Sequence, residues 1–259
     1  MQPEFVHEAE PRAANDTVAS RVASFNLDHL EASAKAMLAD ALQRETFGKA
    51  AVVTSFGAES AVLLHLVAAV KPDAPVLFID TRMMFQETLD YQLELTRHLG
   101  LTNVQVISRD SAQLRREDVF GRLHLKDTDA CCHLRKVVPL EEALAGYGAW
   151  VTGRKRFQSA NRATLKPFDH DAAGRVKLNP LSFWEQADIE ACFIRHSLPR
   201  HPLVSDGFTS IGCAPCTRLP ADKKDPRSGR WAGEEKTECG IHIVGGQIVR
   251  ANSQTASGA

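Results

Sequence analysis

The hydrophobic positions of the chain change period after residue 48, and this change predicts a helical beginning followed by an α/β fold. Apolar residues recur at helical spacing over residues 27–47, which predicts one or two helices there. Beyond this point, short apolar runs typical of buried strands alternate with helical patterns. The predicted strands are residues 50–54, 75–80, 104–108, 149–153 and 176–181, and the predicted helices that follow are 61–70, 86–100 and 185–196. This rhythm predicts a doubly wound, mostly parallel sheet of five to six strands with flanking helices.

Turn and cap residues mark the ends of several predicted elements. Pro72 ends one predicted helix, and Gly100 provides the C-cap of the next. Ser182 and Glu185 have the spacing of a capping box and predict the start of the last helix. Residues 111–129 are polar and punctuated by glycine, so we assign no elements there.

The composition is that of an ordinary globular protein, and it limits the partners that the whole molecule can attract. Hydrophobic residues make up 44% of the chain and charged residues 24%, far from the signature of disorder. Lysine and arginine total 31 against 32 acids, so the net charge of -1 creates no global field that attracts nucleic acid or an anionic membrane. Any anion must therefore be bound locally.

The sequence predicts neither membrane insertion nor secretion, and we expect a cytoplasmic protein. The longest apolar stretch, residues 61–70, is interrupted by His65 and has half of the ~20 residues that a membrane-spanning helix needs. The first twenty residues carry acids and prolines but lack the apolar core of a signal peptide.

The six cysteines raise the main functional question, because a reducing compartment favours metal binding or thiol chemistry over disulfides. Cys131 and Cys132 are adjacent, and after 80 intervening residues Cys213 and Cys216 form a Cys-x-x-Cys pair. Four thiolates from two loops can close one metal site. Structural zinc, a four-iron cluster and unrelated free thiols all remain open, although adjacent cysteines reach the corners of an iron–sulfur cube more easily. Cys192 lies inside a predicted helix and is expected to be a buried small hydrophobe.

Two further features predict an anion site at the carboxyl edge of the sheet. The loop SFGAES, residues 55–60, lies between a predicted strand and a helix, where open parallel sheets bind ligands. It matches neither a Walker loop nor a dinucleotide fingerprint. Basic residues cluster after the strand that ends at Gly153 and again further on, and arginines of the first cluster could clamp phosphate or sulfate. The two clusters are Arg154, Lys155, Arg156 and Arg162, and Lys223, Lys224, Arg227 and Arg230.

Cys239 stands apart from the other cysteines, in the stretch EEKTECGIH, and is expected to be exposed and movable. Three neighbouring glutamates disfavour a thiolate there, whereas Lys236 and His242 favour one. The residues alone leave its reactivity open.

Together these motifs resemble the assimilatory adenylylsulfate reductases, within the wider family of adenylylsulfate and phosphoadenylylsulfate reductases. The resemblance extends from about residue 50 to 242. Its specific marks are SFGAES, IDT at 79–81, FQET at 85–88, CCHLRK, TGRKRFQSANR, HPLVSDGFTSIGCAPCTR and ECGIH. The resemblance implies an adenine nucleotide α-hydrolase-like fold and a thioredoxin-dependent reduction of adenylylsulfate to sulfite and AMP, in sulfate assimilation and cysteine biosynthesis. The loop SFGAES differs from the FSGAED of the cluster-bearing branch and is closer to the phosphoadenylylsulfate branch.

The resemblance also implies a role for each marked residue. Cys239 would be the nucleophile that takes the sulfate sulfur and carries it as an S-sulfonate until thioredoxin, or glutaredoxin, releases sulfite. Lys136 would link the charge of a metal cluster to that of the substrate. The implied ligands of a 4Fe-4S cluster are Cys131, Cys132, Cys213 and Cys216. The implied nucleotide contacts are Ser55, Gly57, Ser60 and Thr81 with the adenylate part, Arg162, Arg227, Arg230 and His242 with sulfate and phosphate, and Gly153 at the strand end.

This interpretation divides the chain into three parts. Residues 1–25 would be a flexible N-terminal tail, 26–232 a single nucleotide-binding iron–sulfur domain, and 233–259 a mobile segment that delivers the nucleophile. We expect neither nucleic acid nor a membrane as partner, and a homo-oligomer stays open. The alternatives are a phosphoadenylylsulfate reductase, a non-catalytic iron–sulfur or zinc module that senses redox state, and an ATP-dependent adenylyl-transfer enzyme. The redox-sensing alternative leaves ECGIH and the arginine clusters unexplained.

Overall fold

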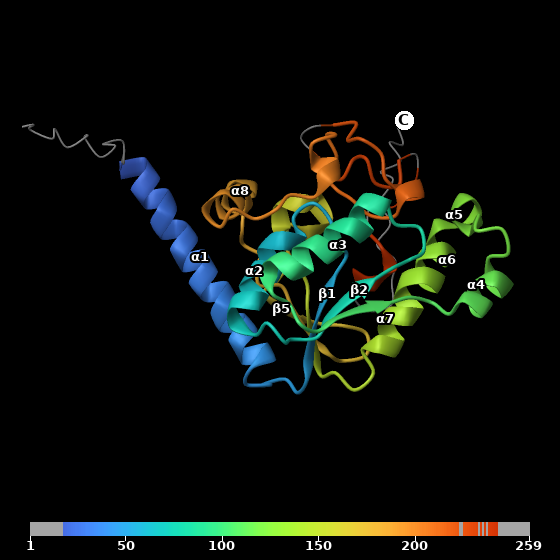
Figure 1. The fold of residues 1–259 in the computed structure, drawn as a ribbon, viewed down its shortest axis with the longest axis horizontal. Coiled ribbons are helices and arrows are strands. Elements are labelled where there is room, and N and C mark those ends of the chain that lie inside the picture. Colours follow the sequence, from blue (N-terminus) through green and yellow to red (C-terminus); the bar gives the residue numbers. More distant parts are fainter. Residues whose placement is uncertain (1–17, 223–224, 233, 235, 237, 243–259) are drawn as a thin grey trace, which may run out of the picture.

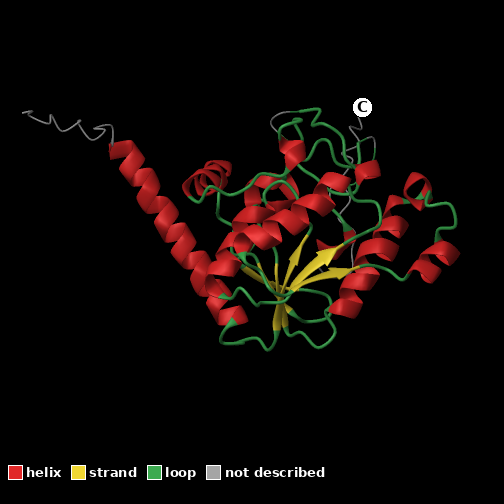
Figure 2. Ribbon diagram, viewed as in Figure 1, coloured by secondary structure: helices red, strands yellow, loops and turns green. Residues whose placement is uncertain are grey.

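One mixed sheet of six strands forms the centre of the molecule, with helices on both of its faces (Figure 2). This computed structural model describes residues 18–222, 225–232, 234, 236 and 238–242. The strands lie in the order β3-β2-β1-β4-β6-β5, and all neighbours pair in parallel except β5 with β6. Their bounds are β1 Ala50–Thr54, β2 Val76–Ile79, β3 Val104–Ile107, β4 Ala149–Val151, β5 Phe168–His170 and β6 Val176–Leu178. The predicted doubly wound, mostly parallel sheet is confirmed.

Helices of very different lengths connect these strands (Figure 1). The α-helices are α1 Val18–Leu42, α2 Ser60–Val70, α3 Gln86–Leu99, α4 Ser111–Glu117, α5 Leu123–Lys126, α6 Thr128–Cys132, α7 Val138–Ala143 and α8 Gln186–Arg195. A π-helical turn, η1 His133–Val137, joins α6 to α7. The short 3-10 helices are η2 Arg156–Gln158, η3 Ala160–Arg162, η4 Pro202–Val204, η5 Ala214–Cys216 and η6 Gly240–His242. Within the described ranges, none of the helices has the length and apolar character needed to cross a bilayer.

The alternation of side chains along the strands explains why both faces of the sheet are covered. Val52 and Val76 point to one face, where they join the larger core formed with α1, α2, α3 and α8. Val53 and Trp150 point to the other face, where they pack with Leu140 of α7. Every residue of β1 and β2 is buried, as expected for strands in the middle of a parallel sheet.

The first helix begins earlier than the hydrophobic pattern predicts. Helix α1 starts at Val18, so residues 18–25 are helical, whereas we expected a tail up to residue 25; residues 1–17 lie outside the described residues. The described side chains from 18 to 26 are exposed, and burial begins at Leu27. Because this first part buries no apolar stripe, hydrophobic periodicity locates the helix only from Leu27 onward.

Three local features also differ from the sequence-based prediction. The last helix has Glu185 as its N-cap, in a capping box with Asp188, so the predicted capping role of Ser182 was wrong. Residues 111–129, which we left unassigned, form short helices. Strand β5 is an additional antiparallel edge strand, too short for its alternation to be recognised in the sequence.

The strand order reverses beside β1, and this reversal creates a place for a ligand. The chain leaves β1 through α2 to pair β2 on one side, and later returns to pair β4 on the other side. In open sheets of this kind, connections that leave in opposite directions open a crevice at the carboxyl ends of the strands. The loop SFGAES connects β1 to α2 at this point, as predicted.

Candidate functional site

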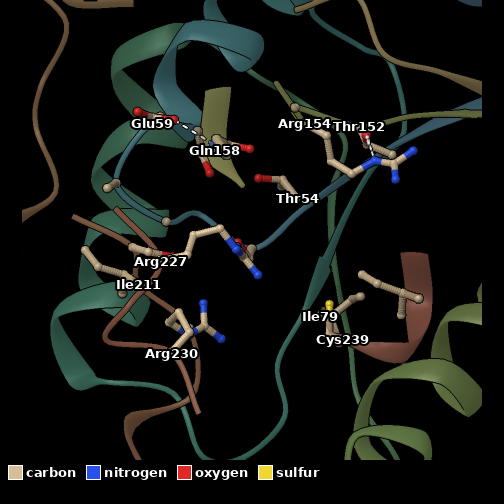
Figure 3. Close-up of a pocket in the computed structure, with 18 of the residues that line it drawn as sticks. Thr54, Glu59, Ile79, Thr152, Arg154, Gln158, Ile211, Arg227, Arg230 and Cys239 are labelled. Atoms are coloured by element: carbon tan, nitrogen blue, oxygen red, sulfur yellow. Dashed lines mark hydrogen bonds between the residues drawn. The ribbon is translucent and has the colours of Figure 1, made fainter. Parts of the chain in front are cut away.

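A cavity of about 200 Å³ opens at the reversal of strand order (Figure 3). Its walls include Thr54 at the end of β1, Ile79 at the end of β2 and Thr152 just after β4. The predicted site residues that line it are Ser55, Gly57, Ser60, Thr81, Lys136, Gly153, Arg162, Cys213, Arg227, Arg230 and Cys239. The predicted residues that do not line it are Cys131, Cys132, Cys216 and His242, and the side chain of His242 lies outside the described residues.

The loop SFGAES is held in a strained but well-supported shape. Phe56 has a φ of 48°, its N–H donates to Thr54 Oγ1 at 3.1 Å, and its ring packs edge-on against Phe78. Positive φ at a residue other than glycine persists only where the surroundings fix it, often at functional sites. The next residue, Gly57, approaches another backbone so closely that a Cβ would lie 3.1 Å from the carbonyl oxygen of Ile211. This shape brings the N-terminus of α2 to the cavity, where helix dipoles favour anions.

Replacing Gly57 with alanine should destabilise the protein by about 1–3 kcal/mol, because the added methyl group overpacks the contact with Ile211. Gly153→Ala is the matched control for stability, because the nearest contact of a Cβ there is the Leu63 side chain at an ordinary 3.5 Å. Urea unfolding of both variants measures the difference. Equal losses of stability in the two variants would contradict the close-approach argument.

Arginine side chains give the cavity a positive wall. Arg227 and Arg230 extend their guanidinium groups into its centre from one side (Figure 3). Arg154 also lines the cavity, but its guanidinium group donates to Thr152 Oγ1 and Asn179 Oδ1. Burial and the proximity of Arg162 lower the pKa of Arg154 to about 10 and also lower that of Arg227. Among the described residues, the buried Nε of Arg230 has no hydrogen-bond acceptor. The wall therefore favours an anionic ligand that would compensate these buried cations; residues 223–224 of the same basic cluster lie outside the described residues.

Gly212 sets the position of the Arg230 side chain. A Cβ on Gly212 would lie 2.2 Å from Nη2 of Arg230, so Gly212→Ala should push the guanidinium out of the cavity wall. We expect binding of AMP, the nucleotide implied by the family resemblance, to weaken about tenfold to a hundredfold, because hydrogen bonds to charged groups contribute about 1.5–3 kcal/mol. Calorimetric titration should give Gly212→Ala and Arg230→Ala similar affinities. Affinity equal to that of the unaltered protein would show that Arg230 does not hold the ligand.

The first basic cluster divides between the cavity and its surroundings. Lys155 is buried, and its Nζ binds Glu59 Oε2 at 2.6 Å. Gln158 Nε2 donates to the same oxygen at 2.8 Å (Figure 3). Arg156 turns away instead, with its guanidinium 4.0 Å from the ring centroid of Phe183. Lys155 therefore fixes the position of Glu59 at the start of α2. Of the arginines predicted to clamp an anion in this cluster, Arg154 and Arg162 line the cavity, and Arg156 does not.

The four cysteines predicted to bind a metal come together beside the cavity from two segments. Cys131 and Cys132 end α6, directly before the π-helical turn η1, a kind of turn that often marks functional sites. Cys213 precedes η5, which ends at Cys216. Burial, followed by the proximity of the other three thiols, raises the pKa of Cys131 to about 12. The two pairs are therefore electrostatic neighbours.

Thr81 and Lys136 connect this cysteine group to the cavity. Thr81 Oγ1 lies 3.2 Å from Cys213 Sγ, so the hydroxyl predicted to contact a nucleotide faces a thiol. Burial alone would lower the pKa of Lys136, but the thiols of Cys213, Cys239 and Cys132 raise it above its ordinary value. Lys136 in turn holds the pKa of Cys213 below its ordinary value despite burial. Lys136 thus interacts both with predicted metal ligands and with the predicted nucleophile, Cys239.

The spacing of the sulfur atoms separates the metal sites that the sequence leaves open. Tetrahedral zinc with bonds of about 2.3 Å holds its sulfur ligands about 3.8 Å apart. Among the described residues, no three of the four cysteine sulfurs lie within 4.8 Å of one another. An iron–sulfur cube spreads its ligands over separate corners and suits a wider spacing. The donor set therefore fits a cube better than a single zinc ion.

A second group of potential metal ligands lies between α1 and α8. Glu31, Cys192 and His196 have ligand atoms within 4.8 Å of one another. Both oxygens of Glu31 are already paired: Oε1 lies 2.7 Å from His196 and 3.7 Å from Arg195, and Oε2 lies 3.2 Å from Lys35. The contacts of Glu31 with Arg195 and His196 fasten α1 to the end of α8, so we assign the group a structural role. Cys192 is fully buried, as predicted.

Cys239 lies across the cavity from Arg227 and Arg230 (Figure 3). It is half-buried rather than exposed, in contrast to our expectation. The helix η6 follows directly, and its Ile241 packs on the face of the sheet covered by α7. The buried Lys177 Nζ donates to the carbonyl oxygen of Ile241 at 3.4 Å. These contacts hold the thiol at the cavity wall.

Comparisons with known proteins identify the family of the chain. The family described as "Phosphoadenosine phosphosulfate reductase domain" matches residues 49–219, which include the loop SFGAES and all four clustered cysteines. The chain belongs to the phosphoadenosine phosphosulfate reductase family. A relative from Mesorhizobium japonicum, named adenosine 5'-phosphosulfate reductase, is 47% identical over 91% of this chain and 92% of its own. A relative of the same name from Chelativorans sp. is 44% identical over 92% of this chain and 96% of its own.

A solved structure of the phosphoadenosine phosphosulfate reductase family also resembles this chain. It is a phosphoadenylyl-sulfate reductase from Candida auris in complex with phosphate, with a TM-score of 0.62 and 25% identity over 74% of this chain and 96% of its own. The matched family region of the present chain ends before the segment that carries Cys239.

The sequence interpretation missed three residues at this site. Lys177 belongs to a strand, and only the fold brings it beneath the C-terminal segment. Gly212 lies in a recognised motif, but no spacing rule predicts that the Arg230 side chain fills the space beside it. The sequence indicates Glu238 only as a charge that disfavours a thiolate, whereas its carboxylate pairs with Arg162. A carboxylate directly beside a predicted nucleophile was the signal that could have drawn attention to it.

Proposed function

We propose that this protein reduces adenylylsulfate to sulfite and AMP, with a dithiol protein such as thioredoxin as the reductant. The observation that carries the proposal is that Cys239 faces Arg227 and Arg230 across one cavity. A ligand whose anionic end binds these arginines presents that end to the thiol. The name shared by the relatives at 47% and 44% identity, adenosine 5'-phosphosulfate reductase, supports the choice of substrate.

The nucleotide would lie with its adenylate part along the loop SFGAES and its phosphosulfate toward the arginines. Residues 26–232 would form the nucleotide- and metal-binding unit, and 233–259 the segment that carries the nucleophile. The residues assigned to the adenylate part and the strand end are Ser55, Gly57, Ser60, Thr81 and Gly153, and those assigned to sulfate and phosphate are Arg162, Arg227, Arg230 and His242.

The reaction would proceed through two sulfur transfers. The Cys239 thiolate attacks the sulfate sulfur and forms an S–S bond, while the S–O bond to the phosphate breaks and AMP leaves with that electron pair. Arg227 and Arg230 stabilise the charge that develops on the leaving phosphate. A reductant thiolate then attacks Cys239 Sγ, so that sulfite departs with the electron pair of the S–S bond and a mixed disulfide remains. The second reductant thiol resolves this disulfide; two thiols are oxidised as one sulfate sulfur is reduced.

We further propose that Cys131, Cys132, Cys213 and Cys216 hold a 4Fe-4S cluster. The meeting of two cysteine pairs and sulfur spacings wider than zinc requires both support this choice. When bound, such a cluster would supply a fixed, redox-capable iron–sulfur centre beside the cavity. Lys136 balances the negative charge of this thiol group and keeps a cation at the cavity wall.

Mapping the sulfur adduct tests the proposed function. Reduced protein would be incubated anaerobically with adenylylsulfate, without thioredoxin, and digested for mass spectrometry. We expect an S-sulfonate on Cys239 and an equal amount of released AMP, whereas the buried Cys192 serves as an internal control that stays unmodified. Phosphoadenylylsulfate is tested in parallel, because the loop SFGAES and the Candida auris structure both point to it as the second candidate. If neither adenylylsulfate nor phosphoadenylylsulfate forms an adduct on Cys239, the mechanism is overturned.

A further inference from the structure

Arg162 lies in the anion cavity, yet its guanidinium fork is already filled by a protein carboxylate. Its Nε and Nη2 donate to the two oxygens of Glu238, the latter at 2.8 Å, and its Nη1 donates to Gln158 Oε1. Two parallel hydrogen bonds of this kind form the strong, geometrically specific pairing between guanidinium and carboxylate. A phosphate or sulfate that binds the same fork must replace Glu238.

Glu238 also approaches a second arginine of the site. Its Oε2 lies 3.5 Å from Arg227 Nη2, and both arginines line the cavity. Burial would raise the pKa of Glu238, but Arg162, Arg227 and Arg154 hold it below its ordinary value, so the group is a carboxylate at neutral pH. By contrast, the buried Nε of Arg230 lacks an acceptor among the described residues. One part of the anion site is thus occupied by the protein itself, and another part is open.

We propose that Glu238 stands in for the anionic group of the nucleotide: it docks the Cys239 segment on Arg162 and Arg227 until a bound nucleotide displaces it. The inference rests on the proposed function. A carboxylate and an edge of a phosphate or sulfate present the same pair of oxygens to a guanidinium fork. Glu238 is therefore both a positioning residue for the neighbouring thiol and a competitor of the nucleotide.

The two ends of the segment around Cys239 are held by different means. Glu238, on the N-terminal side, is held through charge that an incoming anion can replace. Ile241, on the C-terminal side, is held through its backbone carbonyl by Lys177 and through apolar packing, which an anion does not replace. Displacement of Glu238 thus frees the residue directly before the thiol, while Lys236, paired with Asp129, and Ile241 keep the segment docked beside the cavity.

Glu238→Gln tests the competition because it removes the charge and keeps the side-chain volume. Calorimetric titration of the full chain with AMP should show binding about tenfold tighter than in the unaltered protein, which corresponds to about 1.4 kcal/mol. In single-turnover S-sulfonate formation, the variant should have a lower half-saturating nucleotide concentration, because the nucleotide no longer has to displace a carboxylate from Arg162 and Arg227. Glu238→Asp, which keeps the charge, should restore weaker AMP binding.

Glu234→Gln is the matched control. Glu234 lies on the same segment as Glu238, but its carboxylate accepts from the hydroxyl of Thr128 in α6 and not from an arginine of the cavity. It should leave AMP binding unchanged; an equal gain in affinity would reveal a general charge effect and overturn the inference. Unchanged or weaker AMP binding in Glu238→Gln would overturn it as well. If the unaltered protein binds AMP and forms the Cys239 adduct while Glu238→Gln binds AMP normally, only this inference fails. If the unaltered protein does neither, the proposed function fails first.

Discussion

Cys239→Ser should lower sulfite release from adenylylsulfate about 10³-fold or more, because the loss of a catalytic nucleophile removes the covalent route. A serine hydroxyl stays protonated at neutral pH and cannot accept the sulfur as an S–S adduct. The substitution leaves the arginine wall intact, so AMP should bind as it does to the unaltered protein. Sulfite assays with a dithiol reductant, together with titration by AMP, measure both effects.

Cys192→Ala provides the matched control for the loss of a thiol. Cys192 is fully buried between α1 and α8, away from the cavity, so this variant should keep its activity even if it is less stable. Metal content should be unchanged in Cys239→Ser, which separates the reductase from a redox-sensing module that works through the other four thiols. Substantial sulfite release by Cys239→Ser would refute the proposed nucleophile.

Cys213→Ser should remove most of the bound metal, because it takes one thiolate from a four-cysteine site. In protein purified without oxygen, we expect about four iron and four sulfide per chain before the substitution and little of either after it. Cys213 is also fixed to the sheet: it pairs with Met84 in a β-bridge, and the N–H of Ala214 donates to the Met83 carbonyl at 2.8 Å. Elemental analysis and the visible absorption of iron–sulfur centres provide the measurement.

Glu31→Gln distinguishes the two groups of potential ligands. If Glu31, Cys192 and His196 only join helices, this variant should retain all of its iron. Zinc in place of iron in the unaltered protein would contradict the argument from sulfur spacing. Loss of metal in Glu31→Gln, with retention of metal in Cys213→Ser, would place the metal at Glu31, Cys192 and His196. That result would contradict the proposed four-cysteine site.

The central sheet and the place of the site could be predicted because their signals are local. Buried parallel strands are continuous apolar runs, and Gly100 ends α3 in the left-handed conformation that its position requires. The loop SFGAES lies between a strand and a helix, so the topology of parallel sheets places it at the carboxyl edge. Residue spacing also revealed the cysteine pairs and the basic clusters, and the resemblance then implied their roles. Of these residues, Arg162, Arg227, Arg230, Cys213 and Cys239 line the cavity, whereas Cys131, Cys132 and Cys216 do not.

The remaining features depend on contacts between residues that are far apart in the chain. The start of α1 carries exposed side chains and therefore no periodic signal. The pairing of Glu238 with Arg162 joins positions 76 residues apart, and the carbonyl of Ile241 in η6 is bound by Lys177 of strand β6. Residue spacing contains no information on such pairs, because the fold alone decides which charges meet.

The loop that carries Arg227 and Arg230 is joined to the segment that carries Cys213 and Cys216. The N–H of Trp231 donates to the carbonyl of Cys216 at 3.1 Å, and Thr217 pairs with Arg230 in a β-bridge. A change in the position of the Cys-x-x-Cys pair would therefore also shift the arginines that line the cavity.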